Sequence, residues 1–190
     1  MVGVLILSFL TLWASPASPA GQSERAAAPP KAVNVASDPY APLRLYDGKW
    51  DLVPANPDDT AHRDAVHLDT VHLENHCAQV GEFFACNQFV NSKNMALVIF
   101  LPQHPLDNGG YAYRNQALQV EGDNSGTWSA LEITGDRWVY SSDGTDKGKK
   151  IYWRTINVFS GPDKIHFEVQ RSEDSANWTT TMRGDEARAK

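Results

Sequence analysis

Two histidines and a glutamate alternate along one predicted strand with a spacing that could hold a metal ion. In His72-x-Glu74-x-His76 the three side chains project from one strand face, because successive residues point to opposite faces. Imidazole nitrogens and a carboxylate are ligands that zinc accepts. Side chains two residues apart lie about 6.6 Å from each other, however, so a ligand from a second strand is needed. His104 and His166 are the candidates, and the competing interpretation, which we favour, is a solvated outer face.

Two arginines alternate with uncharged residues in predicted strands and are candidates for binding an anion. Arg154 shares a strand face with Tyr152, and Arg114 shares one with Gln116. An arginine inside a barrel needs an anionic partner, and a ligand carboxylate or phosphate accepts a bidentate pair of hydrogen bonds from it. These four residues are the predicted ligand-binding set. The alternative, which we favour for each arginine, is that it faces solvent or stacks on an aromatic ring, because the opposite strand faces are also apolar.

Groups for acid–base or nucleophilic catalysis are scarce. Glu132 and Glu168 lie in predicted strands, but serine, histidine and aspartate form no recognisable nucleophilic pattern. No glycine-rich phosphate loop is present, and no cofactor is indicated. We therefore predict no catalytic residue and favour a protein that is not an enzyme.

The two cysteines lie symmetrically about the predicted turn Gly81–Glu82. Counting outward from this turn places Cys77 opposite Cys86 in an antiparallel hairpin. The spacing therefore predicts a cross-strand disulfide. The same register places the 72–76 motif on the strand face opposite the cysteines.

Residues 1–20 have the pattern of an export signal. The run from Val2 to Ala14 is apolar but too short to span a bilayer, and Ser18-Pro19-Ala20 offers small residues for cleavage. We expect an exported protein, periplasmic or extracellular, with no membrane insertion after signal removal; an oxidising compartment is also what a structural disulfide needs. The net charge of −6 and the lack of a basic stripe argue against nucleic acid as a partner.

The remainder of the chain divides into a leader and one folded domain. Residues 21–42 are rich in Ala and Pro and predict a disordered leader, and residues 43–187 predict the domain. Short runs rich in aromatic and β-branched residues alternate with turn sequences, including Asp143-Gly144. The fold class is therefore all-β, an antiparallel up-and-down meander of 8 to 10 strands closed into a barrel. The predicted strands are 49–53, 67–78, 83–91, 95–101, 111–120, 127–133, 137–141, 150–159, 164–171 and 178–185.

The start and end of this domain resemble a known superfamily. Gly48-Lys49-Trp50 looks like the Gly-x-Trp opening of lipocalin-type (calycin) barrels, and the resemblance implies that a basic residue of the last strand, Arg183, packs over Trp50. The hairpin cysteines, the turn at 157–163 and the ending at 178–185 are similar to small exported bacterial lipocalin-like domains of unknown function.

Together these patterns predict an exported lipocalin-like protein that binds a small amphipathic molecule, partly apolar and with an anionic group if the arginines face inward. Two other classes stay open. One is an enzyme, metal-dependent or acting inside the barrel as an isomerase, cyclase or hydrolase; the other is a protein-interaction module with a packed core. The oligomeric state is not predicted.

Overall fold

The computed structural model describes residues 38–55, 70–122 and 128–190, which form a closed barrel of ten antiparallel strands preceded by one short 3-10 helix. Each strand pairs with its neighbours in the sequence, and β1 also pairs with β10, which closes the barrel. The elements are η1 (Leu43–Tyr46), β1 (Gly48–Ala55), β2 (Val71–Val80), β3 (Phe83–Val90), β4 (Lys93–Pro105), β5 (Tyr111–Gln119), β6 (Ser129–Thr134), β7 (Arg137–Asp146), β8 (Lys149–Phe159), β9 (Lys164–Ser172) and β10 (Thr179–Arg188).

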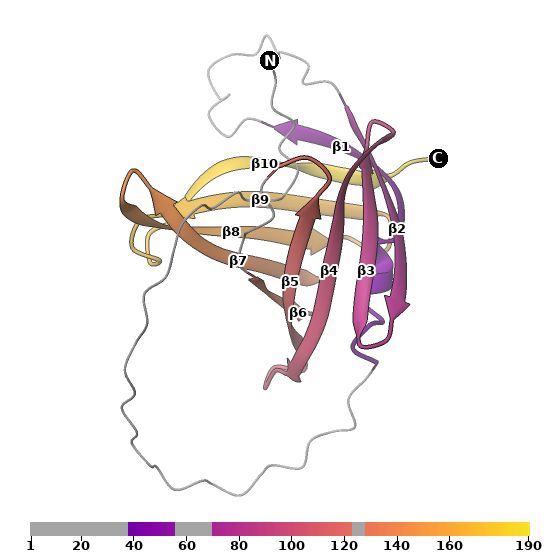
Figure 1. Cartoon of the computed structure of the whole chain (residues 1–190), viewed down its shortest axis with the longest axis horizontal. Helices are drawn as coiled ribbons and strands as arrows, with labels where there is room; N and C mark the ends of the chain where they lie inside the picture. Colours follow the sequence, from indigo (N-terminus) through magenta and orange to yellow (C-terminus); the bar gives the residue numbers. More distant parts are fainter. Residues whose placement is uncertain (1–37, 56–69, 123–127) are drawn as a thin grey trace, which may run out of the picture.

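The strands form two groups that cross at a steep angle (Figure 1). β2 to β5 run nearly upright in this view, whereas β7 to β10 run across it, as expected when a twisted sheet curls to meet its own first strand. The predicted all-β meander is confirmed. It forms because most links are of hairpin length, and antiparallel neighbours need no longer connection. None of the described helices is long and apolar enough to cross a membrane.

Alternation along each strand separates an inner from an outer face. In β9, for example, Ile165, Phe167 and Val169 are buried, while His166 between them is exposed. Cross-strand partners lie on the same face, so the registers extend this assignment around the barrel. The inner face carries most of the buried large side chains, among them Trp50, Leu73, Phe84, Phe100, Tyr113, Leu131, Trp138, Phe159 and Phe167.

The hairpin between β7 and β8 is longer than the sequence predicts. Asp143-Gly144, predicted as its turn, lies within β7, where the two residues pair with Tyr152 and Ile151. The turn is at Lys147-Gly148, whose φ angles of 49° and 79° are both positive. Two consecutive positive φ angles match the right-handed twist of a hairpin, and a glycine accepts one without strain. The prediction of the earlier turn is therefore wrong.

The β2–β3 hairpin has the predicted register. Cys77 lies directly opposite Cys86, and the two form a disulfide across a Cα separation of 4.0 Å. Val80 pairs with Phe83 next to the turn, where Gly81 adopts a φ of +61°. The turn residues and the cysteine spacing thus specify this hairpin locally.

Trp50 of β1 is held by contacts with η1 and with the last strand, β10. The Trp50 indole is fully buried and donates its Nε1–H to the backbone oxygen of Tyr46 at 3.2 Å. The Arg188 guanidinium lies 4.1 Å from the centroid of the Trp50 ring and donates hydrogen bonds to the backbone oxygens of Leu45, at 2.7 Å, and Asp47.

The basic residue over Trp50 is therefore Arg188 and not Arg183, so that prediction is wrong. Trp50 and Arg188 are direct cross-strand partners, whereas Arg183 is exposed and lies opposite Ala55 at the other end of β1. The strand β10 continues through Arg188, three residues beyond the predicted strand end. The residue of β10 that lies opposite Trp50 is therefore Arg188, which lies outside the predicted strand.

The end of the predicted leader is part of the barrel structure. Residues 38–42 form turns, the Tyr113 hydroxyl donates to the backbone oxygen of Pro39 at 2.6 Å, and the Tyr40 hydroxyl donates to that of Glu82 at 3.0 Å. The predicted signal and the leader up to residue 37 lie outside the described residues.

Replacing both cysteines, as Cys77→Ser with Cys86→Ser, is expected to lower the free energy of unfolding by about 2–3 kcal/mol, because the bond closes a short loop in the unfolded chain. Urea denaturation of the oxidised wild type and the double variant measures the difference. Equal midpoints would contradict a structural role for the bond.

Arg188→Ala is expected to lower the free energy of unfolding by about 2 kcal/mol, because the contact with Trp50 and the bonds to backbone oxygens are lost together. Arg183→Ala is the matched control and should change stability by less than about 0.5 kcal/mol, as exposed substitutions usually do. The same denaturation measurement checks both, and equal losses would contradict the assignment.

Candidate functional site

The barrel interior contains a buried carboxylic acid, Glu186. It lies on the inner face of β10, between Leu52 of β1 and Ile165 of β9, and is 1% exposed. Neither carboxyl oxygen has a hydrogen-bond partner among the described residues. Burial raises the pKa of Glu186 from its usual value of 4.5 to about 7. At neutral pH this carboxyl is therefore poised between its protonated and ionised forms.

Two phenols interact electrostatically with Glu186. Burial and the nearby Glu186 charge raise the pKa of Tyr46, and burial, Tyr46 and Glu186 raise the pKa of Tyr140. Both side chains are therefore neutral at physiological pH. Two buried amides extend this polar cluster. The Asn75 side chain donates a hydrogen bond to the backbone oxygen of Tyr46 at 3.3 Å and accepts one from the Gln88 side chain at 3.2 Å.

Further polar atoms in the interior lack a partner. Trp138 and Asn157 are cross-strand neighbours in β7 and β8, 0% and 2% exposed, yet they do not bond to each other. Leaving one buried polar group unpaired costs about 1–3 kcal/mol, so such groups normally bind water or a ligand. The buried atoms without a partner in the described part of the chain are Asn115 Oδ1, Trp138 Nε1, Asn157 Oδ1, Glu186 Oε1 and Glu186 Oε2.

This arrangement offers a ligand both donors and acceptors. The Trp138 indole N–H is a donor, the Asn157 amide oxygen is an acceptor, and the Glu186 carboxyl is either, depending on its protonation. Aromatic rings surround these atoms: the Trp138 ring lies 6.2 Å from the Tyr46 ring and 4.8 Å from the Phe159 ring, measured between centroids. The site can therefore recognise a molecule that is apolar over most of its surface.

The two predicted arginines lie on the outer face, so an anion site inside the barrel built from them is wrong. Arg114 lies over the ring of Trp128 at 5.2 Å, and Arg154 lies over that of Trp178 at 4.1 Å. Arg154 also donates a hydrogen bond to its cross-strand neighbour Gln170. The alternative given by the sequence, stacking on an aromatic ring, is what the structure shows.

Tyr152 and Gln116, the other two residues of the predicted ligand-binding set, also lie on the outer face. Tyr152 alternates with the inward residues of β8 and lies 5.0 Å from the Lys150 ammonium, measured to the ring centroid. Gln116 alternates with the inward residues of β5 and pairs with Ile99 across the outer face. The inner faces of these strands carry Thr155 and Asn157 in β8 and Tyr113 and Asn115 in β5.

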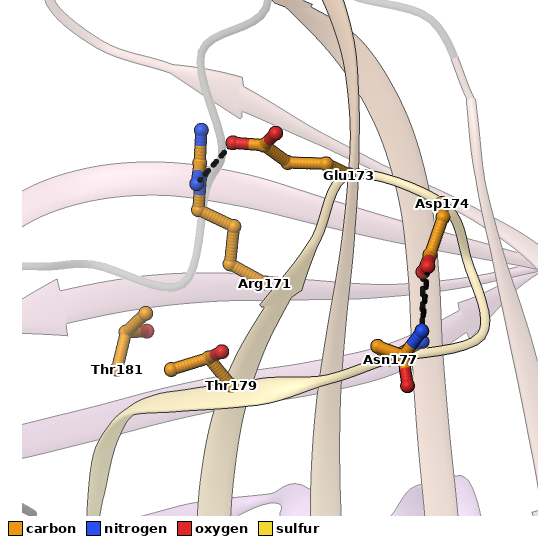
Figure 2. Close-up of a pocket in the computed structure, with 6 residues that line it drawn as sticks. All are labelled: Arg171, Glu173, Asp174, Asn177, Thr179 and Thr181. Carbon is orange, nitrogen blue, oxygen red and sulfur yellow. Dashed lines mark hydrogen bonds and ion pairs between the residues drawn. The ribbon is translucent and has the colours of Figure 1, made fainter.

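Arg171 is an arginine on the inner face that the sequence analysis did not single out. It continues the alternation of Phe167 and Val169 in β9 and lies across from Thr179. Arg171 borders a hollow of about 310 Å³ at the mouth, the barrel end near the β7–β8 and β9–β10 turns (Figure 2). The other residues lining the hollow are Glu173, Asp174, Asn177, Thr179 and Thr181.

The Arg171 guanidinium already forms ion pairs with acidic side chains. It lies 3.3 Å from a Glu173 carboxylate oxygen and 3.4 Å from one of Asp146. Asp174 accepts hydrogen bonds from the Asn177 side chain and backbone, which hold its pKa well below the usual range. Acidic side chains therefore surround Arg171, while Lys147, Lys149 and Lys150 add positive charge at the adjacent β7–β8 turn.

The predicted metal motif lies on the outer face, as the hairpin register requires. His72 pairs with Asp51 at 2.6 Å, and His76 pairs with Glu74 at 3.2 Å. The His76 ring also contacts Phe89 of β3, with ring centroids 5.4 Å apart. These contacts match the solvated outer face that the sequence favours.

Neither predicted additional metal ligand joins this motif. His166 lies in β9, separated from β2 by β1 and β10, and pairs with Asp185 at 2.9 Å. His104 is exposed near the end of β4. Within the described residues, no group of three or more histidine, cysteine, aspartate or glutamate side chains is placed to hold a metal ion.

The sequence did contain a signal for Glu186. Met182, Gly184 and Glu186 alternate at the end of the chain, and continuing the last strand by one residue places the glutamate on the inner face. The predicted strand stopped at Asp185. A charged residue is also usually solvated, so the pattern by itself favours an exposed side chain.

Comparison of the sequence with protein-family models and with curated proteins gives no match. Among solved structures, the chain is similar to the crystal structure of Rv2717c from M. tuberculosis, with 13% sequence identity and a TM-score of 0.38. The similarity covers 82% of this chain and 99% of that one.

The buried acid predicts how stability depends on pH. Because the pKa of Glu186 is raised from 4.5 to about 7 in the folded state, the unfolded chain loses its proton first as the pH rises. Glu186 should therefore lower the free energy of unfolding by about 3 kcal/mol in total between pH 4.5 and pH 7, with no further loss above this range. Glu186→Gln should remove this decrease, as measured by urea denaturation at pH 5 and pH 8.

The exposed Glu132 of β6 provides the control. Glu132→Gln should keep the decrease of the wild type. A Glu186→Gln variant whose stability falls with pH as steeply as that of the wild type would contradict a raised pKa at this site.

Proposed function

We propose that this protein is an exported, lipocalin-like binding protein that takes a small, partly apolar molecule into its barrel and does not transform it. The observation that supports this most directly is the set of unpaired polar atoms on Glu186, Trp138 and Asn157. Within a core of aromatic and aliphatic side chains, these atoms are the ones that could fix the orientation of a bound molecule.

Affinity would come mainly from burial of the apolar body of the ligand, which contributes about 25 cal/mol for each Å² removed from water. The polar atoms would add specificity, because a ligand that satisfies them removes the cost of leaving them unpaired. A molecule of the same shape without matching polar groups would not.

The ligand we propose differs in charge from the anionic one that the arginines suggested. Arg114 and Arg154 stack on aromatic rings of the outer face. The inner face instead carries an acid, Glu186, with no ion-pair partner among the described residues. A negatively charged group beside an ionised Glu186 would be repelled, so a neutral or positively charged polar group fits this site better.

Export is part of the proposal and is supported by the disulfide. Cys77 and Cys86 are bonded in the barrel, and structural disulfides persist in oxidising compartments. The apolar run of residues 2–14 with small residues after it supplies the sequence argument for an export signal.

Native mass spectrometry of the protein purified from its own host is expected to show a second mass, higher by that of one small molecule. Asn157→Leu should decrease the fraction of this form, because it removes an unpaired acceptor from the interior. Asn87→Leu makes the same chemical change on the outer face of β3 and should leave the fraction unchanged. Wild-type protein that shows only the mass of the bare chain would contradict the proposal.

A further inference from the structure

We propose that the polar group of the ligand is an amine, which binds as a cation against the Glu186 carboxylate. This inference rests on the proposed function, that the barrel interior binds a small molecule. Two observations support it, the unpaired acid itself and the aromatic side chains near it, and the net negative charge of the chain adds to them.

Within the described residues, no basic side chain pairs with the Glu186 carboxylate, and Arg188 on the same face of β10 donates instead to backbone oxygens of Leu45 and Asp47. Neither of its oxygens accepts a hydrogen bond from a described residue, and burial is the single resolved cause of its raised pKa. Its direct cross-strand neighbours, Leu52 and Ile165, are apolar. An ammonium group placed here would donate hydrogen bonds to both oxygens and would balance the charge, which favours the ionised form of the acid.

Aromatic side chains near Glu186 also favour a cation. Tyr46 and Tyr140 interact with Glu186 electrostatically, and the Tyr46 ring lies 6.2 Å from that of Trp138. The faces of such rings carry negative charge and attract ammonium groups, most strongly where water is excluded. A neutral hydroxyl gains little from these faces, and a carboxylate is repelled by them.

The charges around the Arg171 hollow are mixed. Asp146 and Glu173 pair with Arg171 and Asp174 lines the same hollow, whereas Lys147, Lys149 and Lys150 lie at the adjacent β7–β8 turn. The whole chain also carries a net charge of −6. This net negative charge favours the approach of a cation over that of an anion.

A set of three probes with the same phenyl body tests this inference: 2-phenylethylamine, 2-phenylethanol and 3-phenylpropanoate. They differ chiefly in the charge of the polar group, which is positive, neutral and negative at pH 7.5. Calorimetric titration of the whole exported chain, with its disulfide intact, gives the affinity for each probe. We expect the amine to bind about tenfold more tightly than the alcohol, and the carboxylate to bind most weakly.

Glu186→Gln removes the charge and keeps the shape of the side chain. We expect it to weaken amine binding about tenfold and to change alcohol binding by less than about threefold. Retained alcohol binding also shows that the variant is folded. Glu132→Gln, on the outer face of β6, should change neither affinity.

The possible outcomes separate this inference from the function on which it rests. If none of the three probes binds, the proposed function fails for molecules of this class, and the inference fails with it. If the alcohol or the carboxylate binds as tightly as the amine, or if Glu186→Gln leaves amine binding unchanged, the inference is overturned while binding in the interior stands.

Discussion

The pairing of β1 with β10 is the constraint on which the rest of the structure depends. Trp50 lies opposite Arg188 and Leu52 opposite Glu186, so this one register decides what the closing strands direct inward. A slip of one residue would turn every side chain of β10 to the other face. Glu186 would then be solvated, and Asp185 would point into the barrel. Closure also removes the free strand edges that an open sheet would expose to other chains.

With this register, the barrel separates two kinds of polar chemistry. On the outer face, charged groups are satisfied locally, as where Arg154 stacks on Trp178 and His72 pairs with Asp51. On the inner face, the Glu186 carboxyl and the Trp138 indole N–H have no hydrogen-bond partner in the described part of the chain. Burying such groups opposes folding, and the free energy of a stable domain is only about 5–15 kcal/mol. Unpaired groups at this cost are more often found where a protein binds something than where it only packs.

The strand order and the hairpin cysteines could be predicted because both depend on local patterns. Turn residues such as Gly81 require particular backbone angles, and two cysteines equally spaced from a turn fix a register. The faces of β8 could not be assigned in this way. Tyr152, Arg154 and Ile156 form one face and Trp153, Thr155 and Asn157 the other, so both mix polar with apolar residues.

The buried acid was missed for a related reason. Its burial depends on a partner strand more than 120 residues earlier in the chain, which a local pattern does not contain. The same long-range pairing gives Trp50 its contact with Arg188 instead of Arg183. The sequence thus predicts which segments are strands better than it predicts what lies inside the barrel, because the second question is settled only when the first and last strands meet.

The central claim is that a small molecule binds among Glu186, Trp138 and Asn157 inside the barrel. The indole N–H resonances of the tryptophans, assigned with Trp138→Phe and Trp178→Phe variants, test it most directly when 2-phenylethylamine is added. The account predicts that the Trp138 resonance shifts in a saturable way, because its buried N–H lies at the site, and that the Trp178 resonance on the outer face stays in place. A shift of Trp178 with no change at Trp138 would contradict it.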